Sequence, residues 1–180
     1  ILEERELPKK YFAYTPCYRR EAGSHRANER GIIRVHQFDK VEMFQYTTPE
    51  KSAEALEELV GKAEKLVQGL GLHYRVTKLA AEDCSAGAAK TFDIEVWIPS
   101  LNTYYEVSSA SNVKDYQARR GDIRYKPTDG SKTRYVHMLN ASGLATSRLM
   151  VSILESYQNE DGSITVPEIL VPFTGFDKIG

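Results

Sequence analysis

Residues 91–109 read TFDIEVWIPSLNTYYEVSS, and this stretch decides the fold class. Its first half alternates apolar with polar side chains, and the apolar members are Phe92, Ile94, Val96 and Ile98. A period of two is that of a strand with one buried face. The turn-like sequence SLN at 100–102 leads into a second strand over residues 103–109. Two strands joined by so short a connection run antiparallel.

Further strands are expected on both sides of this pair. Aromatic and β-branched residues predict them over 10–19, 32–47, 73–79 and 133–139. Because proline cannot donate to a ladder, Pro16 predicts a break or a sheet edge near the end of the first. The polar stretch that ends at Gly31 predicts a loop between the first two strands.

Two helices accompany the strands. Pro49 opens the first, which ends at Gly69 and Gly71 and has helically spaced apolar residues at Ala53, Leu56, Leu59, Val60, Ala63, Leu66, Val67 and Leu70. The second stops before Asp161 and is marked by Leu144, Met150, Ile153, Leu154 and Tyr157. Residues 113–125 fit neither pattern. Without βαβ alternation, the chain is predicted to form one α+β domain over residues 1–180, an antiparallel sheet flanked by helices.

Composition narrows the class of protein. The 180 residues carry 24 Lys+Arg against 25 Asp+Glu, so no overall positive field attracts a nucleic acid. No apolar run is long enough for a membrane span, and the N-terminus lacks the apolar core of a signal peptide, so we expect a cytoplasmic protein. Cys17 and Cys84 stand alone, which argues against a disulfide framework or structural zinc. The opening residues ILEERELP, without an initiator Met, lead us to expect a piece of a longer protein.

The strand predicted over 32–47 has a polar face as well as a core face. Side chains two apart share a face, so this one carries Arg34, His36, Phe38, Lys40 and Glu42. A cation, a ring and a carboxylate, each about 13 Å from the next at about 3.3 Å per residue, suit a ligand with phosphate, a flat base and an amine. The alternative is a solvated sheet face whose charges pair across strands, which is the commoner meaning of such a pattern.

Other charged pairs suit the same kind of ligand. Arg19 and Glu21, at the end of the preceding strand, offer a bidentate contact to phosphate and an acceptor for an amino group. Glu106 and Ser109 provide oxygen atoms near a strand end, where Mg²⁺ could bind. The sequence has no GxxxxGK[ST], GxGxxG or GxSxG motif. If ATP binds, arginines and a metal ion must hold it against a sheet.

Three long strings resemble class II seryl-tRNA synthetases. YRREAG at 18–23, followed by Arg30-Gly31, IRVHQF at 33–38 and KVE at 40–42, resembles their motif 2. The run KTFDIEVWIPSLNTYYEVSSASNVKDYQARR at 90–120 resembles their central catalytic segment. HMLNASGLATSRLMVSILESYQNEDGSITVPEILVPF at 137–173 resembles motif 3 and the tail that follows it. The resemblance covers nearly the whole chain in the family's order, and it implies the C-terminal half of the catalytic domain.

The resemblance implies roles for nucleotide-binding residues. Arg19 would contact the α-phosphate of ATP, Glu21 the adenine amino group, and Arg34 the outer phosphates. Phe38 would stack on adenine, with Arg148 on its opposite side. The three arginines would be the catalytic groups. The nucleotide-facing stretches also include Val35, Glu106, Val107, Ser108 and Ser109.

The resemblance also implies a metal site and a serine site. Glu106 and Ser109 would hold Mg²⁺, and Glu42 would contact L-serine, with Asn140 and Ser142 lining the side-chain pocket. The family's motif 1, its Thr-x-Glu loop and its N-terminal tRNA-binding coiled coil are absent from these residues. AEDCSAGAAKT at 81–91 also departs from the Gly-rich stretch of the family.

The function implied is that of a serine–tRNA ligase, which forms seryl-adenylate from L-serine and ATP and transfers the seryl group to tRNA(Ser). The full-length enzyme would be a homodimer with no membrane association. Two alternatives remain: a paralogue that loads an amino acid onto a carrier protein, and a non-catalytic nucleotide-binding subunit. The retained Arg19, Arg34 and Arg148 favour the ligase.

Overall fold

A computed structural model describes residues 1–20 and 31–180 of the chain. Its main sheet has six strands in the order β2-β3-β9-β6-β5-β4, and every neighbouring pair is antiparallel. These strands span Lys9–Tyr18 (β2), Gln37–Thr47 (β3), Tyr74–Lys78 (β4), Lys90–Ile98 (β5), Thr103–Asn112 (β6) and His137–Ala145 (β9). The predicted α+β class, an antiparallel sheet flanked by helices, is confirmed.

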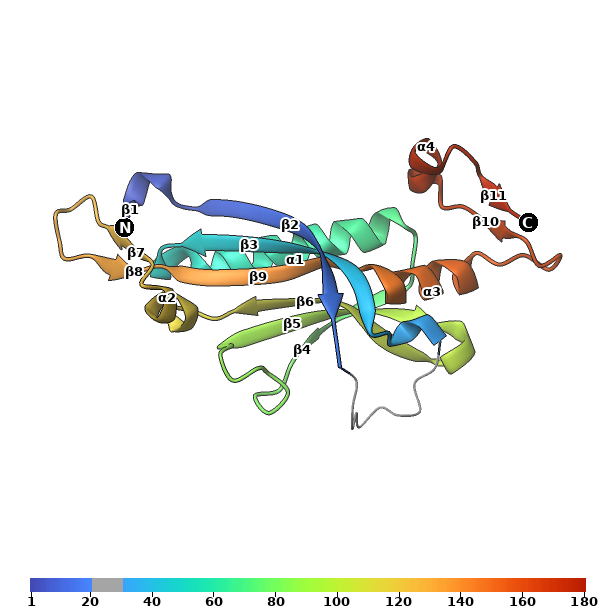
Figure 1. The fold of residues 1–180 in the computed structure, drawn as a ribbon, viewed down its shortest axis with the longest axis horizontal. Helices are drawn as coiled ribbons and strands as arrows, with labels where there is room; N and C mark the ends of the chain where they lie inside the picture. The colour runs from blue at the N-terminus through green and yellow to red at the C-terminus, as the bar shows by residue number, and fades with distance from the viewer. Residues whose placement is uncertain (21–30) are drawn as a thin grey trace.

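Two smaller sheets lie at opposite ends of the molecule (Figure 1). One joins β1 (Leu2–Glu3), β7 (Arg124–Lys126) and β8 (Arg134–Tyr135), and the other joins β10 (Ile164–Thr165) and β11 (Lys178–Ile179). The helices are α1 (Ser52–Gly69), α2 (Tyr116–Gly121), α3 (Thr146–Ser156) and α4 (Val171–Thr174). Short 3-10 turns are η1 (Glu4–Glu6), η2 (Gly31–Ile33), η3 (Pro49–Lys51), η4 (Pro99–Leu101) and η5 (Glu168–Leu170).

Helix α1 covers one face of the main sheet, where it runs along the strands (Figure 1). Its first half packs against Ala110, Leu139 and Ala141, and its second half reaches a cluster that contains Ile94 and Val96. The period-two pattern of β5 therefore identified the core face correctly. The helical stripe was right with two exceptions, since Ala53 and Leu66 are exposed while Ala55 is buried.

The strand predicted over 32–47 is wrong at its start. Pairing between β2 and β3 begins at Tyr18 and Gln37, so Arg34 and His36 lie outside the strand. The preceding residues form η2 instead, and Ile33 is buried where η2 meets α3. The spacing of about 13 Å was inferred from a continuous strand. It does not hold for Arg34, because Arg34 precedes the first residue of β3, Gln37.

The strand predicted over 133–139 is also corrected, because it is two strands in two different sheets. β8 ends at Tyr135 and β9 begins at His137, with the fully buried Val136 between them. Residues 113–125, which had no assignment, contain α2 and the first two residues of β7. Pro16 lies in β2, the edge strand of the main sheet, as its chemistry predicted. None of the described helices is long and apolar enough to cross a membrane.

Candidate functional site

The candidate residues gather on the sheet face opposite α1. Cα partners on neighbouring strands share a face, and Glu42 on β3 is paired with Ser142 on β9. On the next strands, Ser111 of β6 is paired with Asn140, and Ser109 is paired with Asp93 of β5. Polar side chains therefore follow one another across four adjacent strands, and α3 closes one end of this face.

A small cavity of about 50 Å³ marks the place where α3, η2 and the strands meet. It is lined by Arg19, Ile33, Val35, Phe38, Lys40, Glu106, Ser142, Ala145, Ser147 and Arg148. Six of these ten residues were predicted from the sequence to line the site: Arg19, Val35, Phe38, Glu106, Ser142 and Arg148. Segments up to 129 positions apart in the chain thus converge on one cavity.

Arg148 is the buried cation of this cavity, with only 7% of its surface exposed. Its Nε donates to the carbonyl oxygen of Ile33 at 3.2 Å, and its Nη1 donates to the carbonyl oxygen of Glu106 at 2.9 Å. The same Nη1 lies 3.6 Å from the Glu106 carboxylate. The planar guanidinium therefore joins η2 to β6 and presents its charge to the cavity.

Arg19 and Phe38 face each other across the β2–β3 pair. The Arg19 guanidinium lies 4.9 Å from the centre of the Phe38 ring, in a cation–π arrangement. The backbone N–H of Arg19 donates to the His36 carbonyl at 2.8 Å, which fixes the end of the ladder. A positive group and a flat apolar ring are thereby presented side by side, as a phosphate-linked aromatic base requires.

Glu42, Asn140 and Ser142 form one hydrogen-bonded cluster. Asn140 Nδ2 donates to Glu42 Oε1 at 2.8 Å, and Ser142 Oγ donates to Glu42 Oε2 at 3.1 Å. Lys40 adds an ion pair to Glu42 Oε2 at 2.8 Å, a partner that the sequence reasoning had placed on this face without a role. The Glu42 side chain is 13% exposed, so its carboxylate is held in one orientation.

A β-bulge allows Glu106 and Ser109 to share a face. Residues three apart on a regular strand point to opposite faces, but β6 opposes Asp93 with Ser109 and Glu95 with Glu106. Val107 is the extra residue of the bulge, without a register partner on β5, and it is fully buried in the core. The bulge therefore brings both oxygen donors to the open face.

Asp93, which sequence reasoning assigned no role, lies beside these two donors and is 8% exposed. Burial, together with the nearby charges of Glu106 and Glu95, raises the pKa of Asp93 to about 6 against the lowering effect of the Ser109 hydroxyl. The period-two pattern had placed Asp93 away from the core, and that was the available signal. A second cavity of about 510 Å³ is lined by Asp93, Glu95 and Glu106 among others, so Glu106 borders both cavities.

The remaining predicted residues have different surroundings. Val107 belongs to the core, and the Ser108 hydroxyl donates to the Ser142 carbonyl at 2.6 Å, so both predicted residues are buried away from the open face. Arg34 is half-buried just after η2 and is absent from the lining of the small cavity. Glu21 lies outside the described residues. The described part of the chain has no cluster of three or more His, Cys, Asp or Glu side chains placed to hold a metal ion.

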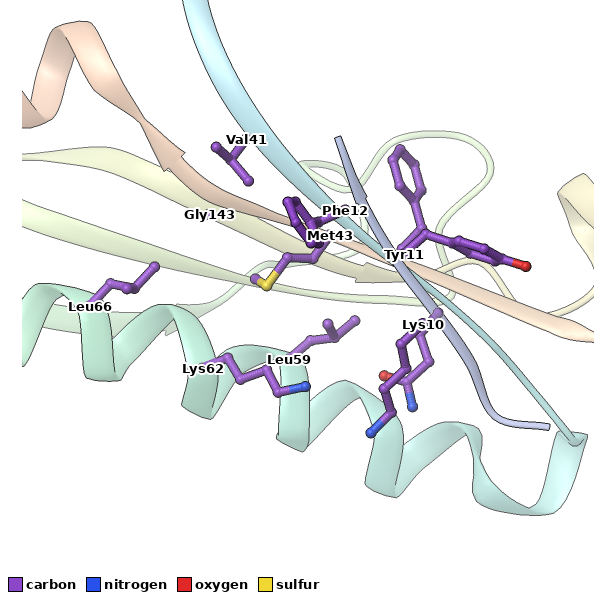
Figure 2. A pocket seen from close by; sticks show the side chains of 11 residues that line it. Lys10, Tyr11, Phe12, Val41, Met43, Leu59, Lys62, Leu66 and Gly143 are labelled. Carbon is purple, nitrogen blue, oxygen red and sulfur yellow. The ribbon is translucent and has the colours of Figure 1, made fainter. Parts of the chain in front are cut away.

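A separate apolar groove of about 300 Å³ lies on the other side of the sheet (Figure 2). Figure 2 shows Leu59, Lys62 and Leu66 of α1 facing Phe12 and Met43 of the strands across it. Lys62 also forms an ion pair with Glu58 at 2.7 Å. Because the groove opens on the α1 side, it is not part of the candidate site.

Comparison with known proteins agrees with this geometry. Residues 1–157 match the protein family described as tRNA synthetase class II core domain (G, H, P, S and T). The chain belongs to the class II tRNA synthetase core family. Serine–tRNA ligase 2 of Clostridium acetobutylicum is 70% identical to this synthetase core over 179 residues, which are 99% of the chain and 42% of the relative. Serine–tRNA ligase of Thermotoga maritima is 60% identical over the same length and share.

Solved structures of seryl-tRNA synthetases share the fold of this synthetase core. The Pyrococcus horikoshii enzyme complexed with ATP aligns with a TM-score of 0.95 and 46% identity, over 99% of this chain and 40% of that one. The cytoplasmic Naegleria fowleri enzyme in complex with AMP aligns with a TM-score of 0.90 and 42% identity, over 99% of this chain and 42% of that one. The resemblance read from the sequence is thus confirmed. The chain spans about two fifths of the length of the relatives it matches.

Proposed function

We propose that this synthetase core forms the ATP- and serine-binding part of a serine–tRNA ligase. The parent activity is the formation of seryl-adenylate from L-serine and ATP, followed by transfer of the seryl group to tRNA(Ser). Relatives named serine–tRNA ligase, 60–70% identical over 99% of the chain, support this assignment over a carrier-protein ligase or a non-catalytic subunit.

One observation carries the proposal. The cavity lined by Arg19, Phe38, Glu106 and Arg148 touches the cluster around Glu42 through a shared residue, Ser142. A nucleotide that lies on this face with its α-phosphate at the cavity would therefore lie beside the Glu42 carboxylate, the group proposed to contact serine. Adjacent sites for a phosphate and for an amino acid are what adenylate formation requires.

The proposed nucleotide roles are those that the resemblance implies, and the charge and shape of the residues suit them. Arg19 contacts the α-phosphate, Phe38 stacks on adenine, and Arg148 supplies the second cation beside it. Arg34 serves the outer phosphates from its position after η2, and Glu21 accepts from the adenine amino group. Because the serine carboxylate is itself the nucleophile, the protein needs only to orient the reactants and stabilise developing charge, which arginines do. A protein nucleophile is therefore not expected.

The serine pocket uses the three-residue cluster. The Glu42 carboxylate accepts from the ammonium group of serine, while Asn140 and Ser142 hold Glu42 in place and meet the serine hydroxyl. An amino acid without a hydroxyl would leave the remaining hydrogen-bonding capacity of Asn140 and Ser142 without a partner in the closed pocket. The pocket therefore favours serine over alanine.

Glu106 and Ser109 fit a divalent cation of the hard type. The bulge places both oxygen donors on one face, and Mg²⁺ is commonly held by one or two protein oxygens, with phosphates and water as its other ligands. When bound, the ion would neutralise phosphate charge.

The proposal extends to the organisation of the parent protein. We assign residues 1–180 to the class II core from motif 2 onward, and we place the parts that contact tRNA and complete a homodimer in the remaining length of the parent protein. We place the protein in the cytoplasm, where its tRNA substrate is found.

Serine-dependent exchange of pyrophosphate into ATP tests the proposal. The chain and its full-length parent are assayed with serine, and with threonine and alanine as controls. We expect exchange with serine only, and an Arg19→Gln variant that exchanges at less than one hundredth of the rate. Exchange that is independent of the amino acid added, or a parent without exchange despite ATP binding, would refute the assignment.

A further inference from the structure

Asp93 is a buried carboxylate with an unsatisfied oxygen. It is 8% exposed, and its Oδ1 has no hydrogen-bond partner among the residues that the structure describes. An ionised carboxylate that is buried without a partner costs several kcal/mol, so a purely structural role would favour an apolar or fully paired side chain here. The position therefore calls for a partner other than the residues that the structure describes.

The residues around Asp93 indicate where such a partner would bind. Asp93 is the register partner of Ser109, which places the carboxylate and the hydroxyl on neighbouring strands of the same face. It also lines the cavity of about 510 Å³ into which Glu106 projects. Asp93 is thus adjacent to Ser109 and lines the same cavity as Glu106, the two oxygen donors of the candidate cation site.

Glu95, on the same face of β5, provides an internal comparison. Its Oε2 accepts from Arg75 Nε at 2.5 Å and from Thr77 Oγ1 at 3.0 Å, so its charge is already balanced inside the protein. Among the described residues, the cation that acts on Asp93 is Arg148, which already donates to carbonyl oxygens of η2 and β6. Of these two acidic residues, Asp93 is the one with a carboxylate oxygen that has no partner among the described residues.

We propose that Asp93 is a positioning residue of the divalent-cation site. Its carboxylate accepts the Ser109 hydroxyl proton in a hydrogen bond, which leaves an Oγ lone pair facing the ion, and its negative charge strengthens the attraction for a cation. This inference rests on the proposed function, because the site takes its cation together with the phosphates of ATP. Groups that orient metal ligands typically change metal affinity by about 10–100-fold when they are removed.

Mn²⁺ affinity, measured by electron paramagnetic resonance in the presence of a non-hydrolysable ATP analogue, tests the proposal without reference to catalysis. We expect Asp93→Asn to weaken Mn²⁺ binding at least tenfold while nucleotide affinity in EDTA stays within twofold. Glu95→Gln is the matched control and should change Mn²⁺ affinity less than twofold. In a Ser109→Ala background, Asp93→Asn should have a markedly smaller effect, because the two residues act together.

The outcomes separate this inference from the function on which it rests. Unchanged Mn²⁺ affinity in Asp93→Asn, or an equal loss in Glu95→Gln, overturns the role of Asp93 and leaves the proposed function standing. Failure of the unmodified chain to retain Mn²⁺ with the nucleotide overturns the cation site and Asp93 with it. If Asp93→Asn does not fold, carbon NMR of the unmodified chain decides: Mg²⁺ added with the analogue must shift the Asp93 carboxyl signal, and an unmoved signal refutes the proposal.

Discussion

Replacing Arg148 by methionine should destabilise the fold as well as the site. The side chain is 7% exposed and donates two hydrogen bonds, to Ile33 at 3.2 Å and to Glu106 at 2.9 Å. A hydrogen bond from a charged donor contributes about 1.5–3 kcal/mol net. Two such bonds, less the desolvation cost that the buried guanidinium bears, give an expected loss of about 3 kcal/mol in the free energy of unfolding.

Lysine at the same position separates charge from geometry. An ammonium is a point donor, and it cannot span two carbonyl oxygens on different elements as a planar guanidinium does. We therefore expect Arg148→Lys to lose about 1.5 kcal/mol, roughly half of the methionine effect, because one of the two bonds is kept. The exposed Met150 on the same helix provides the control, since Met150→Gln should cost less than about 0.5 kcal/mol.

Urea unfolding followed by circular dichroism measures these differences, with the slope of the transition as a check that the unfolded states are alike. A loss below about 1 kcal/mol in Arg148→Met would refute the view that the guanidinium holds η2 against β6. Full stability in Arg148→Lys would show that charge alone is sufficient and that the fork geometry contributes nothing. In either variant, ATP affinity should fall, because the anchored segment lines the cavity.

Three further predictions concern other parts of the molecule. Lys10 and Lys62 donate to Glu58 and lower its pKa from 4.5 to about 2, so Glu58 should stabilise the fold fully above about pH 5 and lose that effect as pH falls toward 2. Because its side chain is 37% exposed, screening reduces the contribution to about 1 kcal/mol. Glu58→Gln should show that deficit in urea unfolding at pH 7 and less than half of it at pH 3, and a constant deficit would contradict the linkage. Glu42→Gln should weaken serine binding more than about tenfold by calorimetry with ATP affinity unchanged, whereas parallel losses would mean a general disturbance. Phe38→Leu should weaken ATP binding by about 1–3 kcal/mol, the typical value of base stacking, and an unchanged dissociation constant would exclude stacking on this ring.

Local sequence pattern predicted the parts of the fold that depend on local geometry. The alternation in β5 gave its core face, and the helical spacing of α1 gave most of its buried stripe, because side-chain direction repeats with the backbone. Pro16 indicated the sheet edge through its missing N–H. Such features need no knowledge of partners distant in the chain.

Features that depend on distant partners were not predictable in this way. Residues 34–36 have the composition of a strand, but the ladder with β2 begins only at Gln37. Likewise Val136 interrupts a stretch that reads as one strand, because its side chain is buried in the small cluster with Ala118 and Tyr125. In both places tertiary packing overrides an apparent local preference.

The candidate site depends on the same kind of long-range information. Periodicity placed Phe38 and Glu42 on one face, but nothing in the spacing linked Arg148 or Ser142 to them. Those two were found only through the resemblance of whole strings. The alternating pattern marked Asp93 as a polar position of its strand. That its Oδ1 lacks a hydrogen-bond partner among the described residues could be learned only from the three-dimensional structure.

Irregularities in the two central strands explain why a regular pattern alone could not reveal the site. On β6, three steps from Glu106 to Ser109 oppose two steps on β5; on β9, three steps from Ser142 to Ala145 oppose two steps from Glu42 to Lys40 on β3. Each extra residue turns the following side chains over to the other face of the strand. The cation donors thereby share one face, and Ala145 lies opposite Lys40 at the start of α3, the helix that carries Arg148. The two bulges therefore place the nucleotide-facing and metal-facing groups together, and a sheet of unbroken period two would have pointed half of them into the core.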